Sequence, residues 1–198
     1  MIVVKIGGSV AEVAGEIFNE LYETGRDVLV VPGGWIFAEK IRELNVDDDS
    51  AHWMAIEAMN IYGYYLSRYA ELIEPHDFDF EIRGVRILLP YILLKKYDEL
   101  PHSWDVTSDS ITVWIAEKVD AGKIIKVTDV DGIVSGGRVL EKITAGDISF
   151  ETCIDRFTPR LLEEYGREMF ICNGFARGRV KDYIMKGIAF GTTVIGRW

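Results

Sequence analysis

The sequence opens with MIVVKIGGS, residues 1–9, a short apolar run that ends in two glycines and a serine. A run this rich in β-branched residues, and too short for a buried helix, predicts a buried parallel strand. Lys5 lies near the carboxyl end of that strand, where a sheet would hold it rigidly. Gly7 and Gly8 let backbone N–H groups approach a ligand, and Ser9 can cap the helix that follows. The stretch therefore indicates a phosphate site, with a plain tight turn as the alternative interpretation.

A second strand ends in the same way. Residues 27–34 read DVLVVPGG, again an apolar run that leads through Gly33 and Gly34 into a helical pattern. The carboxyl ends of parallel strands lie at one edge of a sheet, where open α/β folds bind their ligands. We therefore expect two groups of backbone amides to lie beside each other at that edge.

Composition limits the possible classes of function. At 198 residues and 48% hydrophobic content, the chain suits a single domain over residues 1–198 with a sizeable core. The formal net charge of −10 argues against nucleic acid as a partner, so an anionic ligand must be attracted by local features. Cys153 and Cys172 are too few for a disulfide scaffold, and we expect both to be thiols. Since no signal peptide or membrane-spanning stretch is recognisable, the sequence predicts a cytoplasmic protein that binds no membrane.

Strand and helix patterns alternate along the chain, which predicts an α/β fold: a three-layer α/β/α sandwich with a mainly parallel sheet. Pro90 ends one strand near Leu89, and irregular chain is expected after it. The acidic residues 47–49 lack the alternating ligands of a cation-binding loop, so a solvated turn is predicted. Helices are expected at 11–24, 35–44, 50–68, 107–119, 158–165 and 177–185, and further strands at 71–73, 85–89, 123–128, 138–143, 168–172 and 192–195.

Three further stretches carry polar chemistry where strands end or helices begin. Residues 104–110, WDVTSDS, place two carboxylates and three hydroxyls at a helix start, where side chains can cap amides or hold a lysine. Residues 126–133, KVTDVDGI, and the pair Asn173-Gly174 each follow the end of a strand, at the ligand-binding edge of the sheet. Neither a P-loop nor a dinucleotide-binding glycine pattern is present in the sequence.

Taken in order, these motifs resemble those of the amino acid kinase family over essentially the whole length of the chain. That family includes acetylglutamate, aspartate, uridylate and isopentenyl phosphate kinases. The resemblance implies the α/β sandwich, ATP and Mg²⁺ as cofactors, and phosphoryl transfer to a small molecule. Phosphoryl transfer depends mainly on positioning and charge stabilisation, so N–H donors and magnesium matter more than a covalent nucleophile. The motifs are Lys5 with Gly7-Gly8-Ser9, Pro32-Gly33-Gly34, Ser108-Asp109-Ser110, Thr128 to Ile133, and Gly191 to Ile195.

The resemblance also assigns roles to residues. It implies that Lys5 and Asp109 are catalytic, with Lys5 neutralising the transferring phosphoryl group and Asp109 orienting Lys5. The backbone N–H groups of the two double-glycine turns would bind that phosphoryl group, and no side chain is assigned as a metal ligand. The residues implied to bind the nucleotide are Gly7, Gly8, Ser9, Thr128, Asp129, Asp131, Gly132, Ile133, Asn173 and Gly174.

Within the family, residues 51–56, residues 102–104 together with 107–110, and residues 172–174 are most similar to the archaeal branch that acts in methanofuran biosynthesis. This resemblance implies a small phosphate monoester as the acceptor. A flat, amine-bearing ring is expected, because tryptophans and a nearby carboxylate could enclose the ring and its ammonium group. The residues expected to bind the acceptor are Gly33, Gly34, His52, Trp104, Asp105 and Ser108.

Several of these acceptor residues have a structural alternative. His52 falls on an expected helix, where packing or a surface position is the ordinary role of a histidine. Trp104 could fill the core instead of stacking on a ring. The roles of His52 and of His102, which lies close to Trp104 in the sequence, therefore stay open at this point.

One departure from the family pattern concerns charge. Acetylglutamate kinases carry a second lysine where this chain has FICN, residues 170–173. The positive charge on the leaving side must then come from Arg177, Arg179 or Lys181, or from magnesium alone.

Other acceptors and another class of protein remain as alternatives. Isopentenyl phosphate kinases place a histidine shortly after the second glycine turn, where this chain has WIFA, residues 35–38. A nucleoside monophosphate kinase is a further alternative. A non-catalytic anion or metal-oxide storage protein of the same fold would not need Lys5 together with Asp109. We also expect the protein to form a homo-oligomer.

Overall fold

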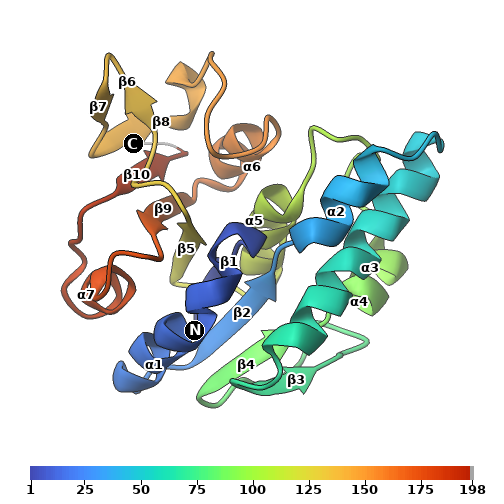
Figure 1. Ribbon diagram of the computed structural model, residues 1–198, viewed down its shortest axis with the longest axis horizontal. Helices are drawn as coiled ribbons and strands as arrows, with labels where there is room; N and C mark the ends of the chain where they lie inside the picture. Colours follow the sequence, from blue (N-terminus) through green and yellow to red (C-terminus); the bar gives the residue numbers. More distant parts are fainter. Residues whose placement is uncertain (197–198) are drawn as a thin grey trace.

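The computed structural model describes residues 1–196 as a sheet between layers of helices (Figure 1). Its centre is an eight-stranded sheet with the strand order β3-β4-β2-β1-β5-β9-β10-β8, and β6 and β7 pair in a separate hairpin. The strands are β1 (Ile2–Ile6), β2 (Val28–Pro32), β3 (Glu71–Ile73), β4 (Val85–Leu88), β5 (Lys123–Thr128), β6 (Val134–Ser135), β7 (Arg138–Val139), β8 (Lys142–Thr144), β9 (Glu168–Asn173) and β10 (Thr192–Ile195).

Parallel pairing joins the strands that carry the predicted motifs. β1 lies between β2 and β5, with Lys5 opposite Val31 on one side and Lys126 on the other. β9 continues on the far side of β5, and Thr128 pairs with Asn173. The segments that follow these four strands therefore meet at one edge of the sheet. β10 runs antiparallel to β9, so the sheet is mainly rather than wholly parallel, as predicted.

Helices cover both faces of the sheet because the strands bury apolar side chains on both. The two-residue period of β1 sends Val3 to one face and Val4 to the other. The Val3 face packs against α5, the Val4 face packs against α1 and α7, and α3 contributes to both cores. The predicted α/β/α sandwich is confirmed. The helices are η1 (Gly8–Val13), α1 (Ala14–Glu23), α2 (Trp35–Arg42), α3 (Asp48–Leu66), α4 (Tyr91–Tyr97), α5 (Ser108–Lys118), η2 (Ala145–Asp147), α6 (Thr158–Tyr165) and α7 (Arg179–Lys186).

Two expectations on the amino-terminal side of the chain were wrong. The chain after Pro90 is not irregular but forms α4, because a proline at the N-cap removes no hydrogen bond that the helix would make. The long helix α3 begins at Asp48, with Asp47 rather than Ser50 as its cap. The Asp47 carboxylate accepts the Ser50 N–H at 2.9 Å, so this acidic stretch starts a helix instead of forming a solvated turn.

The first crossover also differs from the expectation. Residues after the first glycine turn form the 3-10 helix η1 before α1 begins at Ala14. Ser9 lies inside η1, and no side chain caps this helix at Gly7. Because the first N–H groups of a helix have no acceptor within it, the uncapped start of η1 leaves donors for a ligand.

No helix within residues 1–196 combines the length and the apolar character needed to cross a membrane.

Candidate active site

The charged centre of the site is Asp109, which lies between two lysines. Neighbouring positions on β1 and β5 place Lys5 and Lys126 side by side, and Asp109 lies in the first turn of α5. Lys5 Nζ is 3.0 Å from Asp109 Oδ1, and Lys126 Nζ is 2.6 Å from Asp109 Oδ2. The expected pairing of Lys5 with Asp109 is present in the structure, and each carboxylate oxygen has its own ammonium partner.

Burial decides the electrostatics of these three groups. Lys5, Asp109 and Lys126 are 7%, 4% and 3% exposed. Burial lowers the pKa of Lys5, and the negative charge of Asp109 offsets part of that effect. For Asp109, burial alone would raise the pKa, but the charges of Lys126 and Lys5 lower it to about 2. The carboxylate is therefore ionised at neutral pH and fixes the ammonium of Lys5 at the edge of the sheet.

Lys126 also belongs to this centre, although none of the family motifs includes it. Its ammonium donates to Asp109 and also to the carbonyl of Cys153. Of the two lysines, Lys5 lines the cleft between the glycine turns and Lys126 does not. A signal was present in the sequence, because a lysine inside the buried run KIIKVT is costly unless it is paired.

The basic residues near α7 that could supply positive charge to the site form ion pairs with other acidic side chains. Arg177 forms an ion pair with Glu16 at 2.5 Å, and Lys181 forms one with Glu23 at 2.7 Å. Both pairs join α1 to the segment of α7, away from Asp109. Lys126 adds a positive charge beside the Asp109 carboxylate, and the source of the positive charge on the leaving side stays a prediction.

A hydrogen-bond network around Asp155 fixes the start of α5. The Asp155 carboxylate accepts the backbone N–H groups of Thr107 at 2.8 Å and Ser110 at 3.0 Å, and the Thr158 hydroxyl at 2.8 Å. The Asp155 N–H in turn donates to Asp109 Oδ2 at 3.3 Å. The starts of α5 and α6 are thus tied together, and this holds Asp109 between the lysines.

The two double-glycine turns lie against each other, but only half of their amides are available to a ligand. Gly7 donates to the Val127 carbonyl at 3.0 Å, and Gly33 donates to the Ile6 carbonyl at 2.9 Å. The expectation that all four glycine amides bind phosphate was therefore wrong for Gly7 and Gly33, whose N–H groups complete the sheet edge. Gly8 opens η1 and Gly34 precedes α2, so their amides have no acceptor within these helices.

Gly8 is required by the close approach of the two turns. A Cβ on Gly8 would lie 2.4 Å from the Cα of Trp35, closer than real Cβ contacts come. The glycine therefore allows η1 and the start of α2 to meet, and it places their free amides next to each other.

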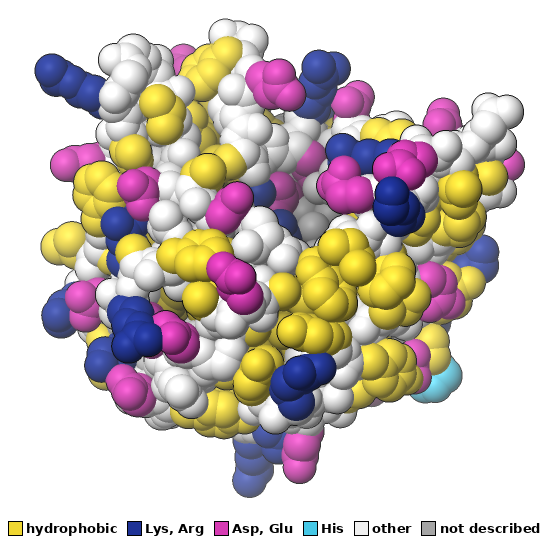
Figure 2. Space-filling view, viewed as in Figure 1, with side chains coloured by type: hydrophobic (Ala, Val, Ile, Leu, Met, Phe, Trp, Pro, Cys, Tyr) yellow, Lys and Arg dark blue, Asp and Glu magenta, His cyan; other side chains and the backbone are white. Residues whose placement is uncertain are grey.

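These elements line a cleft at the carboxyl edge of the sheet. The lining includes Lys5, Gly8, Ser9, Gly34 and Ser108. Figure 2 shows the molecule hollowed between α2 and the part of the chain that carries β6–β8 and α6. An ammonium group, hydroxyls and helix-start amides together form a donor set suited to phosphate oxygens.

The segments expected to flank the nucleotide are brought together beyond β5 and β9. The Gly174 N–H donates to the Thr128 carbonyl at 2.8 Å, and the Asn173 side chain donates to Asp131 at 3.2 Å. Arg179 forms an ion pair with the same Asp131 at 2.5 Å. The backbone of these segments is thus fixed next to the first glycine turn.

Gly132 and Ile133 have structural roles in this region. A Cβ on Gly132 would lie 2.3 Å from the Thr192 hydroxyl oxygen, and the Ile133 N–H donates to that oxygen at 2.8 Å. Both residues are buried, whereas Asp129 is exposed. Binding of a nucleotide by these residues stays a prediction.

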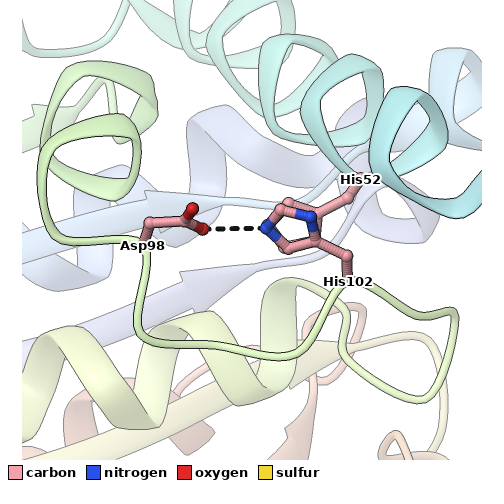
Figure 3. A group of neighbouring side chains, drawn as sticks. All are labelled: His52, Asp98 and His102. Carbon is pink, nitrogen blue, oxygen red and sulfur yellow. Dashed lines mark hydrogen bonds and ion pairs between the residues drawn. The ribbon is translucent and has the colours of Figure 1, made fainter.

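His52 and His102 form a stacked pair on the side of α3 (Figure 3). Their ring centroids are 4.0 Å apart, and His102 lies between Asp49 at 2.6 Å and Asp98 at 2.8 Å. Burial opposes the charge of His102, but its hydrogen bonds to Asp98 and Asp49 outweigh that effect and raise its pKa. Burial and the neighbouring His102 lower the pKa of His52 to about 4, so His52 is neutral at neutral pH. His52, Asp98 and His102 also bring three ligand-type atoms within 4.8 Å of one another.

The residues expected to hold the acceptor divide between two cavities. His52, Trp104, Ser108 and Gly34 line a small apolar cavity between α2, α3 and the segment before α5. Asp105 lies outside it, in a wider groove that Trp104 also borders. The structure therefore brings most of the expected acceptor residues together but separates Asp105 from the apolar cavity.

The fold and the lysine–carboxylate centre match a known class of enzyme, and the chain belongs to the amino acid kinase family. The sequence model of that family matches residues 83–151. The chain is thus a phosphotransferase of the kinase type. A relative from Methanocaldococcus jannaschii, [5-(aminomethyl)furan-3-yl]methyl phosphate kinase, is 33% identical over 99% of this chain and 98% of its own length.

Solved structures agree on the fold. Uridylate kinase from Archaeoglobus fulgidus is 20% identical, with a TM-score of 0.73 over 98% of this chain and 99% of that one. Aspartate kinase from Synechocystis is 16% identical, with a TM-score of 0.66 over 98% of this chain and 39% of that one. At these identities the similarity establishes the fold and leaves the acceptor undetermined.

Proposed function

We propose that this protein transfers a phosphoryl group from ATP to the phosphate of [5-(aminomethyl)furan-3-yl]methyl phosphate, giving the diphosphate in methanofuran biosynthesis. The full-length relative that bears this activity in its name supports the choice of acceptor. The observation that carries the proposal is the continuity of two cavities. Gly34, Ala38 and Ser108 line both the cleft that contains Lys5 and the small apolar cavity. One acceptor molecule can therefore place its phosphate in the cleft and its ring in the apolar cavity.

In the proposed reaction, an oxygen of the acceptor phosphate attacks the γ-phosphorus of ATP, and the bond from that phosphorus to the ADP oxygen breaks. Lys5 and the free amides of Gly8 and Gly34 bind the oxygens that gain charge, while Asp109 keeps Lys5 in place. Segments 128–133 and 173–174 hold the nucleotide in this proposal.

Magnesium, when bound with the nucleotide, supplies further neutralisation of phosphate charge. Asp109 already contacts two lysines, so it is not free to serve as a metal ligand. We expect the nucleotide phosphates and water to hold Mg²⁺, which keeps several waters in such sites.

The quaternary structure and the cellular location are part of the same proposal. We infer a homo-oligomer in the cytoplasm of an archaeon, as expected from the sequence. Size-exclusion chromatography with light scattering tests the first inference, since a monomer at micromolar concentration contradicts it.

A coupled assay of ADP release tests the proposed function. The furan phosphate is compared with uridine monophosphate and isopentenyl phosphate at equal concentrations, and we expect it to be turned over fastest. Faster turnover of either competitor would show that the assigned acceptor is wrong, while the proposed kinase activity would stand. Absence of ADP formation with all three would favour the non-catalytic storage protein.

The same assay tests the role of Lys5. Removing one preorganised charge donor typically lowers the rate by about a hundredfold to a thousandfold, and we expect this loss in Lys5→Met. Lys40→Met, which removes an exposed lysine paired with Glu43 on α2, is the matched control and should keep full turnover. Unaltered turnover in a folded Lys5→Met protein would exclude Lys5 from the mechanism.

A further inference from the structure

The apolar cavity beside the phosphate cleft is lined along one side by a single stripe of α3. Asp48, Ala51, His52 and Ala55 line it, and their spacing of three and four residues places them on one face of the helix. The small alanine side chains leave space beside α3, and Trp104 lines the same cavity. The cavity measures about 60 Å³, against roughly 10–15 Å³ needed for one water molecule. This space suits a small ring better than a nucleoside.

The charges around this cavity are few. Among its lining residues, Arg42 and Asp48 are the two with charged side chains. The Arg42 guanidinium lies over the Trp104 ring, 4.7 Å from the ring centroid. His52 also lines the cavity but is neutral at neutral pH, because burial and His102 lower its pKa to about 4.

Asp48 is a carboxylate without a protein partner in the described part of the chain. Its neighbours are engaged: Asp47 caps α3 through the Ser50 N–H, and Asp49 binds His102. No hydrogen bond or ion pair joins the Asp48 carboxylate to a residue within 1–196, and the side chain is exposed at the cavity.

Asp48 lines the apolar cavity but not the phosphate cleft, which extends along α2 from Gly34 as far as Arg42. Gly34 lies at the start of α2 and Arg42 at its end, eight residues later, which corresponds to a rise of roughly 12 Å. Asp48 begins the next helix, after the turn that follows Arg42. The cavity therefore has helix-start amides near one end and an unpaired carboxylate near the other.

We propose that Asp48 determines the acceptor specificity of this enzyme by binding the ammonium group of an acceptor whose ring occupies the apolar cavity and whose phosphate occupies the Lys5 cleft. This inference rests on the proposed function and names the residue that selects an amine-bearing acceptor. It also assigns the ammonium to Asp48 instead of Asp105, the carboxylate expected from the sequence, because Asp105 lines the adjoining groove and not the apolar cavity.

The experiment compares two acceptors in several variants. The first acceptor is the furan phosphate with its aminomethyl group, and the second carries a methyl group in place of the aminomethyl group. Asp48→Asn is compared with wild type, with Asp105→Asn as the competing carboxylate. Glu57→Gln is the matched control, since Glu57 is an exposed acid on the same helix outside this cavity.

We expect Asp48→Asn to raise the KM for the amine acceptor by about 10-fold to 100-fold, the range of a hydrogen bond to a charged group. The KM for ATP should not change, and the methyl acceptor should be used equally well by Asp48→Asn and wild type. A general disturbance of α3 would instead affect both acceptors alike, so equal effects on the two overturn the proposal.

The remaining outcomes are also decisive. If Asp105→Asn shows the selective loss and Asp48→Asn does not, the ammonium lies in the outer groove and the proposal is wrong. Equal use of both acceptors by wild type overturns it as well, while the proposed kinase activity stands. If wild type turns over neither furan phosphate, the proposed function fails and the assignment of Asp48 fails with it.

Discussion

Asp109 is the residue on which the electrostatics of the site depend, because one carboxylate is the counter-charge of two buried ammonium groups. Its two carboxylate oxygens pair with Lys5 Nζ at 3.0 Å and with Lys126 Nζ at 2.6 Å. Removing one partner from a buried ion pair is far more costly than replacing the whole pair, because an unpaired charge is left without water. Asp109 therefore has a structural role that cannot be separated from its role beside the phosphate cleft.

We expect Asp109→Asn to lower the free energy of unfolding by roughly 3–5 kcal/mol, since two buried lysines lose their counter-charge. It should also lower kcat while the KM for ATP changes little, because an orienting carboxylate matters most when charge moves in the transition state. Urea unfolding and steady-state kinetics with ATP varied measure the two effects. A raised KM for ATP with an unchanged kcat would make Asp109 a nucleotide-binding residue instead.

The control for this prediction is the double variant Asp109→Asn with Lys126→Met, which should recover part of the stability but none of the activity.

The contribution of Asp109 to stability also depends on pH, and the pKa shift gives the direction of that dependence. Because the folded pKa of Asp109 is lowered to about 2, its contribution is complete above the unfolded value of about 4 and is lost as the pH falls through 2. The difference between wild type and Asp109→Asn should therefore persist from pH 7 to pH 4.

At this scale the sequence predicted the pair Lys5 and Asp109 but missed Lys126. The pair followed from the family motifs, which mark both residues. Lys126 has the same local context as Lys5, a lysine near the end of a buried strand, and the register of β1 with β5 brings the two side by side. That register is a long-range property of the sheet, and a single sequence does not specify which strand lies next to β1.

At the scale of elements, the two glycine turns determine how η1 and α2 meet. We expect Gly8→Ala to lower the free energy of unfolding by about 1–3 kcal/mol, the usual cost of an overpacked site, because its Cβ would lie 2.4 Å from the Trp35 backbone. The forced separation of the two helix starts should also lower kcat. Thermal unfolding and the ADP-release assay measure both changes.

Gly122→Ala is the matched control for the glycine prediction. The nearest atom to a Cβ on Gly122 is the Met1 carbonyl oxygen, at an ordinary 3.8 Å. Its stability should stay within about 0.5 kcal/mol of wild type. A Gly8→Ala protein as stable and active as Gly122→Ala would mean that the two turns have room to separate.

Helix and strand types were mostly predictable because period and capping are local, but boundaries were less so. The long helix α3 was expected from Ser50, yet the helix is capped by Asp47, three residues earlier, whose carboxylate accepts both the N–H and the hydroxyl of Ser50. A proline after a strand indicates the end of regular structure, so the sequence does not predict α4. In the structure Pro90 occupies the N-cap of that helix. The division of the acceptor residues between two cavities depends on how α2 and α3 pack, which no local pattern records.

At the scale of the whole molecule, one sheet joins the two halves of the site. The strands on one side of β1 lead to the Lys5 cleft and the acceptor cavity, and β5 and β9 on the other side lead to the expected nucleotide segments. Because β1 and β5 are paired along their length and buried, neither half has a core that is independent of the other. The arrangement favours the single domain expected over residues 1–198.

We therefore expect thermal unfolding to be one cooperative transition that either ligand shifts as a whole. A ligand at 100 times its Kd stabilises a folded protein by about 2.7 kcal/mol, which raises Tm by roughly 5–11 °C for a chain of this size. A non-hydrolysable ATP analogue and the acceptor phosphate, added separately, should each move the same calorimetric peak. Chains longer than about 150 residues often unfold in more than one step, so a single peak is not a trivial result. The opposite result would be two calorimetric peaks, with each ligand shifting only one of them. That result would show that the halves of the sheet unfold independently and that the site lies between two domains.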